Sequence, residues 1–167
     1  MRYVSLPLAL VIACSPGAPE RPPLDTAGIQ REVLAVADSI HAGYAANDAE
    51  AILRHFDQHA DYVSAGDGVY STDSKADAAG SRAFFAGGDH HKYLAFDHLD
   101  RRVAVLAPDV AVFNNRYRET LLYKTGDTAR IRGTYTLVFV RRSGRWKALQ
   151  QYFSHCAGAD TVTCVRP

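Results

Sequence analysis

The sequence has almost no net charge, few cysteines and no apolar stretch long enough to cross a bilayer. Its 167 residues carry 19 basic and 18 acidic side chains, for a formal net charge of +1. A nearly neutral chain has no long-range field to gather nucleic acid or anionic lipid, so we expect no nucleic-acid partner. The apolar stretch Tyr3–Ala13 is shorter than the roughly 20 residues that a spanning helix needs, and Pro7 interrupts it. Hydrophobic residues still make up 47% of the chain, which is enough for the core of one domain.

Several motifs of catalysis and cofactor binding are also missing. The chain contains neither a glycine-rich phosphate loop nor the strand–turn–helix motif that exposes a nucleophilic serine. Histidines are present, but His90 and His91 lie in a glycine-flanked stretch. Asp97 and His98, as neighbours on a strand, are expected to point to opposite faces. We expect His41 at a solvated helix position. The sequence therefore predicts no metal and no cofactor.

The N-terminus has the pattern of a secretory signal peptide. Arg2 supplies a positive charge, an apolar stretch follows, and the small residue Ala13 directly precedes Cys14. The end of this stretch, Val-Ile-Ala-Cys, resembles the lipobox of bacterial lipoproteins, in which the cysteine is acylated and becomes the mature N-terminus. The resemblance implies that residues 1–13 are a signal peptide and that Cys14 carries a lipid. The alternative is an ordinary signal peptide with an incidental cysteine.

The segment that follows agrees with a lipid anchor. Residues 14–24 contain four prolines and cannot form a helix, so we expect a semi-rigid tether between the membrane and the domain. Ser15, rather than an aspartate, follows the cysteine, which resembles the outer-membrane lipoproteins of Gram-negative bacteria. We therefore expect a periplasmic protein that is attached to the outer membrane by its lipid alone.

Two further cysteines, Cys156 and Cys164, lie near the C-terminus. An even number of cysteines in an oxidising compartment favours a disulfide. Such a bridge would stabilise the protein by about 2–3 kcal/mol and would pin residues 157–167 to the domain. Two free thiols are the alternative.

The folded domain is expected over residues 25–156, with helices first and strands afterwards. Apolar residues recur every three or four positions in the first part, and β-rich runs separated by turn residues fill the second. The helices are expected from Asp25 or Thr26 to Tyr44, over 48–57 and over 72–86, and the strands over 61–64, 93–107, 109–124, 128–142 and 145–155. Three helices followed by an antiparallel meander give an α+β fold.

Three short patterns, in this order, resemble the nuclear-transport-factor-2-like superfamily and its SnoaL-like branch. Tyr44–Ile52 is similar to the joint between the first two helices of that family, and Phe56–Tyr62 to the entry into its first strand. Thr136–Val140, the following Ser-Gly turn and Trp146 resemble its last hairpin. The resemblance implies a cone-shaped half-barrel, in which a curved antiparallel sheet wraps the first helix and leaves a pocket at the wide end. It also implies a homodimer that is joined through the sheet.

Two chemistries of this superfamily do not carry over to this sequence. Steroid isomerases of the fold use a tyrosine and two acids, and the corresponding positions here hold Ile40, Ser64 and Thr136. A serine cannot take a proton from carbon near neutral pH without an activating base. Limonene-type epoxide hydrolases need an Arg-x-Asp motif, where this chain has Arg116–Arg118.

Strand alternation leaves a polar set of candidate ligand-binding residues on the inside of the cone. The set consists of Tyr44, Asn114, Arg116, Thr136, Gln151 and His155. It is rich in hydrogen-bond donors and contains no carboxylate, which suits a small anionic or carbonyl-bearing molecule. The alternative is that these groups hydrogen-bond one another across the sheet.

The sequence thus favours a membrane-anchored protein whose cone binds a small molecule. The first alternative is an enzyme of the isomerase, dehydratase or hydrolase kind with His155 as general base, because histidine titrates near neutral pH. A carboxylate within reach of His155 would favour that enzyme, and Asp67 is the nearest candidate in the sequence. The second alternative is a dimeric accessory module that works through its sheet.

The outer face of the sheet is expected to carry Tyr117, Tyr135, Leu137 and Phe139. Large apolar groups on a surface need to be covered. A second copy packed sheet against sheet would cover them, which gives the expected homodimer a physical reason.

Overall fold

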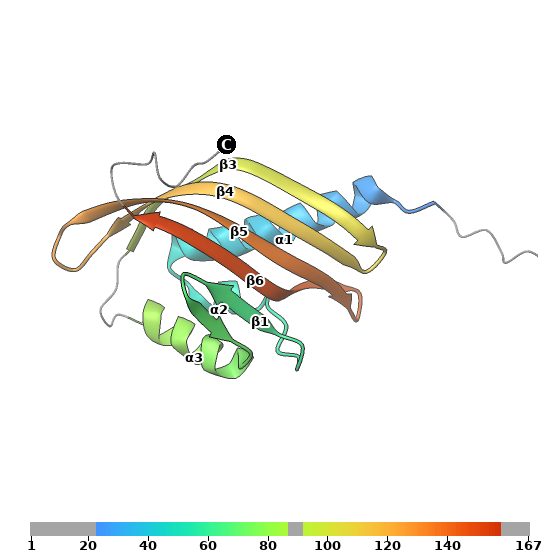
Figure 1. Ribbon diagram of the computed structural model, residues 1–167, viewed down its shortest axis with the longest axis horizontal. Coiled ribbons are helices and arrows are strands. Elements are labelled where there is room, and N and C mark those ends of the chain that lie inside the picture. The colour runs from blue at the N-terminus through green and yellow to red at the C-terminus, as the bar shows by residue number, and fades with distance from the viewer. Residues whose placement is uncertain (1–22, 87–91, 158–167) are drawn as a thin grey trace, which may run out of the picture.

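The computed structural model describes residues 23–86 and 92–157, which form helices and one sheet (Figure 1). The elements are α1 (Thr26–Ala46), α2 (Ala49–Leu53), β1 (Val63–Gly66), β2 (Val69–Ser71), α3 (Ser74–Phe85), β3 (Lys92–Ala107), β4 (Val110–Leu122), β5 (Thr128–Arg142) and β6 (Arg145–Ala157). The expected signal peptide, Cys14 and Cys164 lie outside the described residues, and so does the side chain of Cys156. Among the described helices, none combines the length and the apolar character that crossing a bilayer requires.

Each described helix begins at an aspartate. The carboxylates of Asp25, Asp48 and Asp73 accept hydrogen bonds from backbone N–H groups in the first turns of α1, α2 and α3. Such a cap stabilises a helix by about 1 kcal/mol. α1 ends at Asn47, whose left-handed backbone (φ 53°) turns the chain directly into the cap of α2. These caps fix the joint that the sequence pattern predicted.

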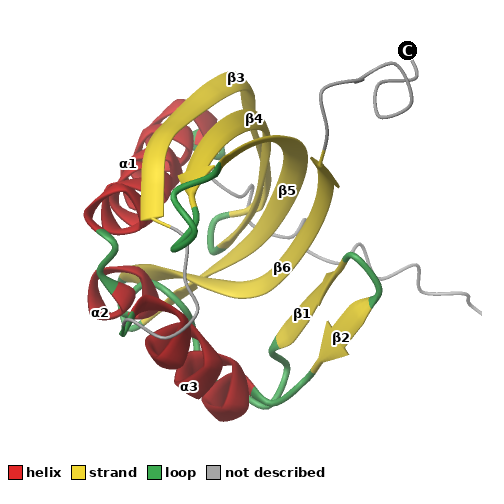
Figure 2. Cartoon of the chain, turned by 90° about the vertical axis from the view of Figure 1, so that its left-hand side faces the viewer, coloured by secondary structure: helices red, strands yellow, loops and turns green. Residues whose placement is uncertain are grey.

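One mixed sheet holds the described strands, in the order β2-β1-β6-β5-β4-β3. β3 to β6 form an antiparallel meander, whereas β1 runs parallel to β6. The meander curves around α1, and α2 and α3 continue below that helix (Figures 1 and 2). This arrangement confirms the expected α+β half-barrel. The short strand β2 and the parallel pairing were not predicted, because three residues carry too little alternation to mark a strand.

Bulges in β3 contribute to the curvature of the sheet. The pairing of β3 with β4 shifts register at Leu94, Leu99 and Leu106. A bulge bends its strand and increases the local twist. All three leucines are exposed, because each falls outside the regular alternation of the ladder.

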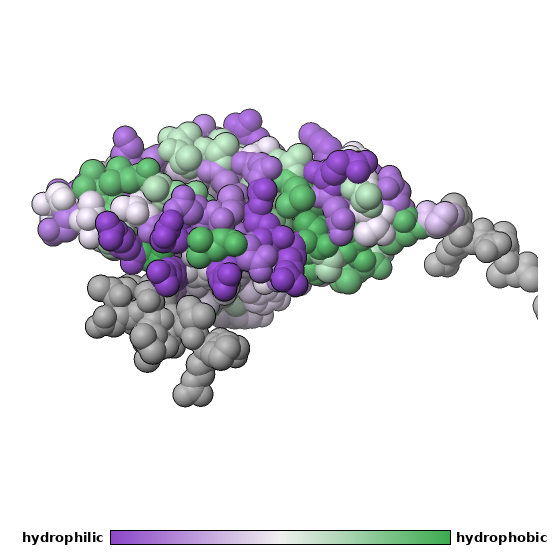
Figure 3. Space-filling view, turned by 90° about the horizontal axis from the view of Figure 1, so that it is seen from above, coloured by the Kyte–Doolittle hydropathy of each residue, from purple (hydrophilic) through white to green (hydrophobic). Residues whose placement is uncertain are grey.

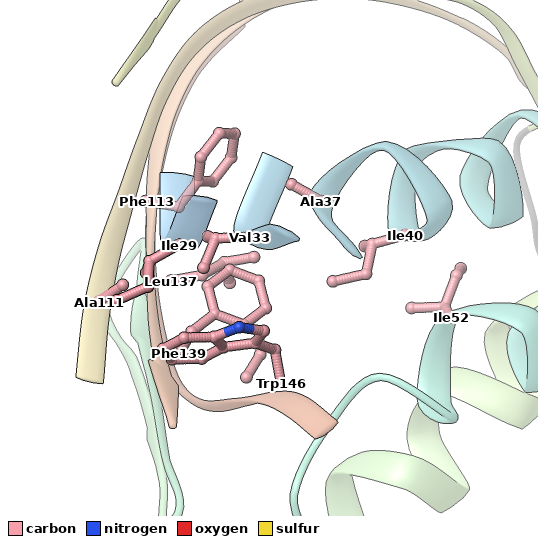
Figure 4. Packing of buried hydrophobic residues seen from close by; sticks show 11 residues of the cluster. Ile29, Val33, Ala37, Ile40, Ile52, Ala111, Phe113, Leu137, Phe139 and Trp146 are labelled. Atoms are coloured by element: carbon pink, nitrogen blue, oxygen red, sulfur yellow. The ribbon is translucent and has the colours of Figure 1, made fainter. Parts of the chain in front are cut away.

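The hydrophobic core lies between α1 and the inner face of β4, β5 and β6. Val33 on α1 packs with Phe113 on β4 and Phe139 on β5, and all three side chains are fully buried (Figure 4). Trp146 at the start of β6 closes the same end of the cluster (Figure 4). The expected apolar stripe of the first helix is therefore the face that the sheet covers.

The predicted register of β4 and β5 was wrong by one residue. Asn114 and Arg116 face outward, and the hydroxyl of Thr136 donates a hydrogen bond to Asn114 Oδ1 on that outer face (2.8 Å). The inner row of β4 instead contains the buried residues Asn115 and Glu119. Because this inner row includes polar residues, the alternation of apolar and polar side chains gives little indication of which face is inside.

The expected apolar outer face is therefore also wrong. Tyr117, Tyr135, Leu137 and Phe139 face α1 or the cavity beside it. Figure 3 views the molecule from the side of β3 and shows hydrophilic groups over much of the surface, with separate hydrophobic patches. The outer face therefore has no large apolar residues of this set that a second copy would need to cover, and this argument for a dimer through the sheet no longer holds.

We predict that Phe113→Ala destabilises the domain by about 3–5 kcal/mol, because the substitution removes a fully buried ring and leaves a cavity. Urea unfolding measures the change in the free energy of unfolding. Leu106→Ala is the matched control: Leu106 lies on the same sheet but is 64% exposed, so its replacement should change that free energy by less than about 1 kcal/mol. Equal effects of the two substitutions would contradict the described packing.

Candidate functional site

A cavity of about 200 Å³ lies between the C-terminal half of α1 and the inner face of the sheet. Most of its lining is aromatic, with polar groups at a few positions. The residues around it are Ile40, His41, Tyr44, Phe56, Tyr93, Phe96, Tyr117, Glu119, Tyr135, Leu137, Gln151, Tyr152, Phe153 and His155. An apolar pocket with a few convergent polar groups is the usual form of a small-molecule site.

Glu119 is the principal ionisable group of this cavity. Its side chain projects from β4 and is only 4% exposed. Burial raises the pKa of Glu119 to about 7, although the nearby His155 opposes this shift. The carboxyl group can therefore give up or accept a proton near neutral pH. The sequence-based register placed Glu119 outside, so the prediction of a pocket without a carboxylate was wrong.

Tyrosine hydroxyls lie in the electrostatic environment of Glu119. Burial raises the pKa of Tyr44 to about 12, and the charge of Glu119 adds to the shift. Burial and then neighbouring groups that include Glu119 also raise the pKa values of Tyr93 and Tyr117 above the ordinary tyrosine range. These hydroxyls therefore keep their protons at neutral pH and can donate hydrogen bonds to a ligand oxygen.

A glycine on β5 makes room for Tyr117. Gly133 pairs with Tyr117 across the β4–β5 ladder. A Cβ atom at Gly133 would lie 2.6 Å from the hydroxyl of Tyr117, which is too close for any side chain. The ring of Tyr117 can therefore lie over the backbone of β5 and line the cavity.

His155 and Asp67 contact each other at the rim of the cavity. The backbone N–H of His155 donates to Asp67 Oδ1 (2.9 Å), and the imidazole Nδ1 contacts Asp67 Oδ2. Burial raises the pKa of Asp67, but the hydrogen bonds from His155 outweigh it and hold that pKa below its usual value. A carboxylate on Nδ1 orients the ring and fixes its tautomer. Asp67 is the carboxylate that the sequence suggested as a partner for His155.

The turn between β1 and β2 positions Asp67. Asp67 and Gly68 both have positive φ values, 48° and 82°, and Gly66 pairs with Val69 on either side of them. An Asp-Gly pair in this conformation is typical of a two-residue hairpin. The dipeptide is therefore the sequence signal that could have located the hairpin and, with it, the acid beside His155.

The structure brings together half of the predicted binding set. Tyr44, Gln151 and His155 line the cavity, whereas Asn114, Arg116 and Thr136 do not. Gln151 donates to the hydroxyls of Tyr62 (3.1 Å) and Ser64 (2.9 Å), so its amide fixes the floor of the site. Among the described residues that line the cavity there is no lysine or arginine.

His41 is a further buried group that the sequence analysis misplaced. It was expected in solvent, but it is 8% exposed, and its Nε2 contacts the hydroxyl of Tyr135. Burial, followed by the charges of His98 and Arg101, lowers the pKa of His41 to about 3, so the imidazole is neutral. The spacing of Val33, Ala37 and His41 by four residues placed all three on one helix face, which could have indicated this burial.

We predict that Glu119 makes the stability of the protein depend on pH. Its pKa rises from about 4.5 in the unfolded chain to about 7 in the fold. The folded state therefore binds the proton more tightly, and this stabilisation is complete below about pH 4.5 and is lost as pH rises through 7. The free energy of unfolding of the wild type, minus that of Glu119→Gln, should fall by up to about 3 kcal/mol over this pH range.

Urea unfolding at a series of pH values measures this dependence. Glu50→Gln is the control, because Glu50 is an exposed glutamate paired with Arg82 (2.5 Å), which holds the pKa of Glu50 below its usual value. In the Glu50→Gln variant, the stabilisation that comes from Glu119 should still be lost as pH rises. A flat difference between wild type and Glu119→Gln would contradict the buried carboxyl group.

Comparisons with known proteins agree with this architecture. A search of curated proteins found no significant match. The fold is similar to a ketosteroid isomerase-like protein from Erwinia carotovora atroseptica (16% identity, TM-score 0.64, 77% of this chain and 97% of that chain). It is also similar to a proposed scytalone dehydratase from Novosphingobium aromaticivorans (12%, 0.64, 75% and 83%) and to the association domain of C. elegans CaMKII (15%, 0.60, 74% and 93%). These identities are low, and the likeness shows the fold alone.

The match to a family model is more extensive and covers the cavity. Residues 33–158 match the model of the SnoaL-like domain. This range includes the second half of α1, the Asp67 turn and all of β3 to β6. The chain therefore belongs to the SnoaL-like domain family.

Proposed function

We propose that this protein is an acid–base enzyme of the isomerase or dehydratase kind that acts on a small, ring-shaped carbonyl compound. The observation that supports it most is that Glu119 and His155 line one aromatic cavity, and that Asp67 contacts His155. An acid and a base on the same pocket, with environments that differ, are the groups that proton transfer requires.

Each polar group then has a chemical role. Glu119 takes the proton from the carbon next to the carbonyl, because a buried carboxylate near its pKa is an effective base. The hydroxyls of Tyr44 and Tyr117 donate to the carbonyl oxygen as negative charge develops there. His155, oriented by Asp67, acts in its imidazolium form and gives a proton to the product or to a departing hydroxyl group. The reaction moves protons and needs no oxidant or cofactor.

The cavity limits the substrate to a small and uncharged molecule. Its volume of about 200 Å³ is near that of the roughly 150 Å³ cavity that admits benzene in an engineered protein. Aromatic side chains such as Phe56 and Phe96 offer flat apolar contacts to a single ring. An anionic ligand is disfavoured, because Arg116 lies on the outer face and Glu119 lies inside. The sequence analysis expected an anionic or a carbonyl-bearing ligand, and the carbonyl-bearing class remains.

We predict that the protein accelerates deuterium exchange into small ketones dissolved in D₂O. Cyclohexanone, cyclohexenone and acetophenone are suitable probes, and proton NMR follows the loss of signal next to the carbonyl. Glu119→Gln should lower the accelerated rate by about 100-fold or more, which is the usual contribution of a general base. The wild-type rate should rise with pH and level off above about 7, where Glu119 is deprotonated.

The matched control is Arg116→Ala, which changes the neighbouring row of the same strand on the outer face. That variant should exchange the ketone at the wild-type rate. Asp67→Asn should have an intermediate effect, since it leaves His155 in place but removes its charged partner. Absence of acceleration with every probe, or a Glu119→Gln rate equal to that of wild type, would contradict the proposal.

The lipid anchor belongs to the same proposal. Its support is the Val-Ile-Ala-Cys pattern before the proline-rich segment 14–24. We predict that Cys14→Ser releases the protein from the membrane fraction or blocks processing of the precursor, because the acylated thiol would be lost. Membrane fractionation and mass spectrometry of the N-terminus measure both outcomes. An unacylated wild-type N-terminus with unchanged membrane partitioning would contradict it.

Two further expectations stay proposals. A Cys156–Cys164 disulfide is supported by the even number of remaining cysteines and by the expected periplasmic location. A homo-oligomer is supported by the likeness of the fold to association domains. The outer row of β4 carries the exposed residues Asn114, Arg116 and Arg118, so apolar contact does not supply a reason for the sheet to be its interface.

A further inference from the structure

A second group of chemically active side chains lies where α1 crosses β3. Asp38 and His41 are one turn apart on α1, and His98 projects from β3 toward them. One ligand atom from each of the three side chains lies within 4.8 Å of the others. The rings of His41 and His98 are in contact, with their centroids 4.1 Å apart. The proposed acid–base chemistry uses none of these residues.

Buried polar atoms in this group lack partners. His41 is more than nine-tenths buried, its Nε2 is engaged by Tyr135, and its Nδ1 has no hydrogen-bond partner in the described structure. The Nδ2 of the neighbouring Asn115 is also buried without a partner there. A buried polar atom without a partner is costly, so it needs an explanation such as a bound ion.

His98 is already oriented as metal-binding histidines usually are. Its Nδ1 lies 3.1 Å from Asn115 Oδ1, an acceptor, so that nitrogen carries the proton. The Nε2 of His98 then has a free lone pair. Histidines that bind a metal typically donate their other ring N–H to such an oxygen, which fixes both the tautomer and the orientation of the ring.

We propose that Asp38, His41 and His98 form a binding site for a divalent transition metal, of which Zn²⁺ is the best match. Two imidazoles and a carboxylate are the ligands that Zn²⁺ accepts, with a fourth position left to water. Bonds of about 2.1 Å would bring the ligand atoms to about 3.4 Å from one another. Asp38 can make most of this adjustment, since its side chain is 56% exposed.

Arg101 competes with the metal for Asp38. Its guanidinium forms an ion pair with Asp38 Oδ1, so the carboxylate is shared between a fixed cation and any metal that enters. The guanidinium of Arg101 and a metal bound to the same carboxylate repel each other, which lowers the apparent affinity. The same competition makes the site testable, because removal of Arg101 should strengthen binding.

Asp97, the residue before His98 in the sequence, gave no indication of this site. Asp97 is adjacent to His98 but pairs with Arg118 on the outer face (2.8 Å). The partners of His98 come instead from a helix far away in the chain. The pairing of β3 with β4 at His98 and Tyr117 turns His98 toward α1.

The test is Zn²⁺ titration of tag-free protein by calorimetry, together with the visible absorption of the Co²⁺ form. We expect one Zn²⁺ per chain and a Co²⁺ spectrum of low coordination number with nitrogen ligands. His98→Ala and Asp38→Asn should each weaken Zn²⁺ binding at least tenfold. Arg101→Gln should strengthen it severalfold, since the competing cation is gone.

Two control variants separate this site from other histidines. His59→Ala removes an exposed histidine that pairs with Asp61 (3.0 Å), and the double replacement of His90 and His91 by alanine removes an adjacent pair. Both should leave the affinity unchanged, with circular dichroism confirming that each variant is folded. Absence of Zn²⁺ binding, binding that His98→Ala leaves intact, or weaker binding in Arg101→Gln would overturn the proposal. None of these outcomes depends on ketone exchange.

Discussion

The packing of α1 into the concave face of the curved sheet is the constraint on which the remaining structure depends. At the N-terminal half of the helix, Val33 packs with Phe113 and Phe139, and all three side chains are fully buried. Toward the C-terminal half, the partners of Ile40 and Tyr44 are longer and partly polar, and a cavity remains. The same helix therefore closes the core at one end and forms a wall of the site at the other.

This arrangement places ionisable groups where water is scarce. Glu119 and His41 are both almost fully buried, and burial shifts their pKa values in opposite directions, upward for the acid and downward for the base. Glu119 is thereby neutral below about pH 7, and His41 is neutral throughout the physiological range. Buried ionisable groups with shifted pKa values are found mostly at functional sites, which agrees with the role proposed for this cavity.

The sequence predicted the helices and strands better than it predicted which face of each strand points inward. The helical stripe through Val33 and Ile40 is long and regular, so α1 and its buried face could be predicted. β4 carries Asn115 and Glu119 on its inner side, which leaves its two faces similarly polar and its register open. That ambiguity is the reason that Arg116 was expected inside and Glu119 was missed. His155 was placed correctly because Gln151 and Phe153 share its side of β6.

The Asp67–Gly68 turn belongs to a hairpin at one edge of the sheet. β2 pairs with β1 alone, β1 joins the sheet along one edge of β6, and Val69 and Tyr70 are exposed. Such a hairpin can open locally at a small fraction of the free energy that unfolding of the core requires. His155 would then lose its carboxylate while Glu119 and the cavity stayed intact. Over evolutionary time, changes in this turn could retune the histidine of the site without any change in the core.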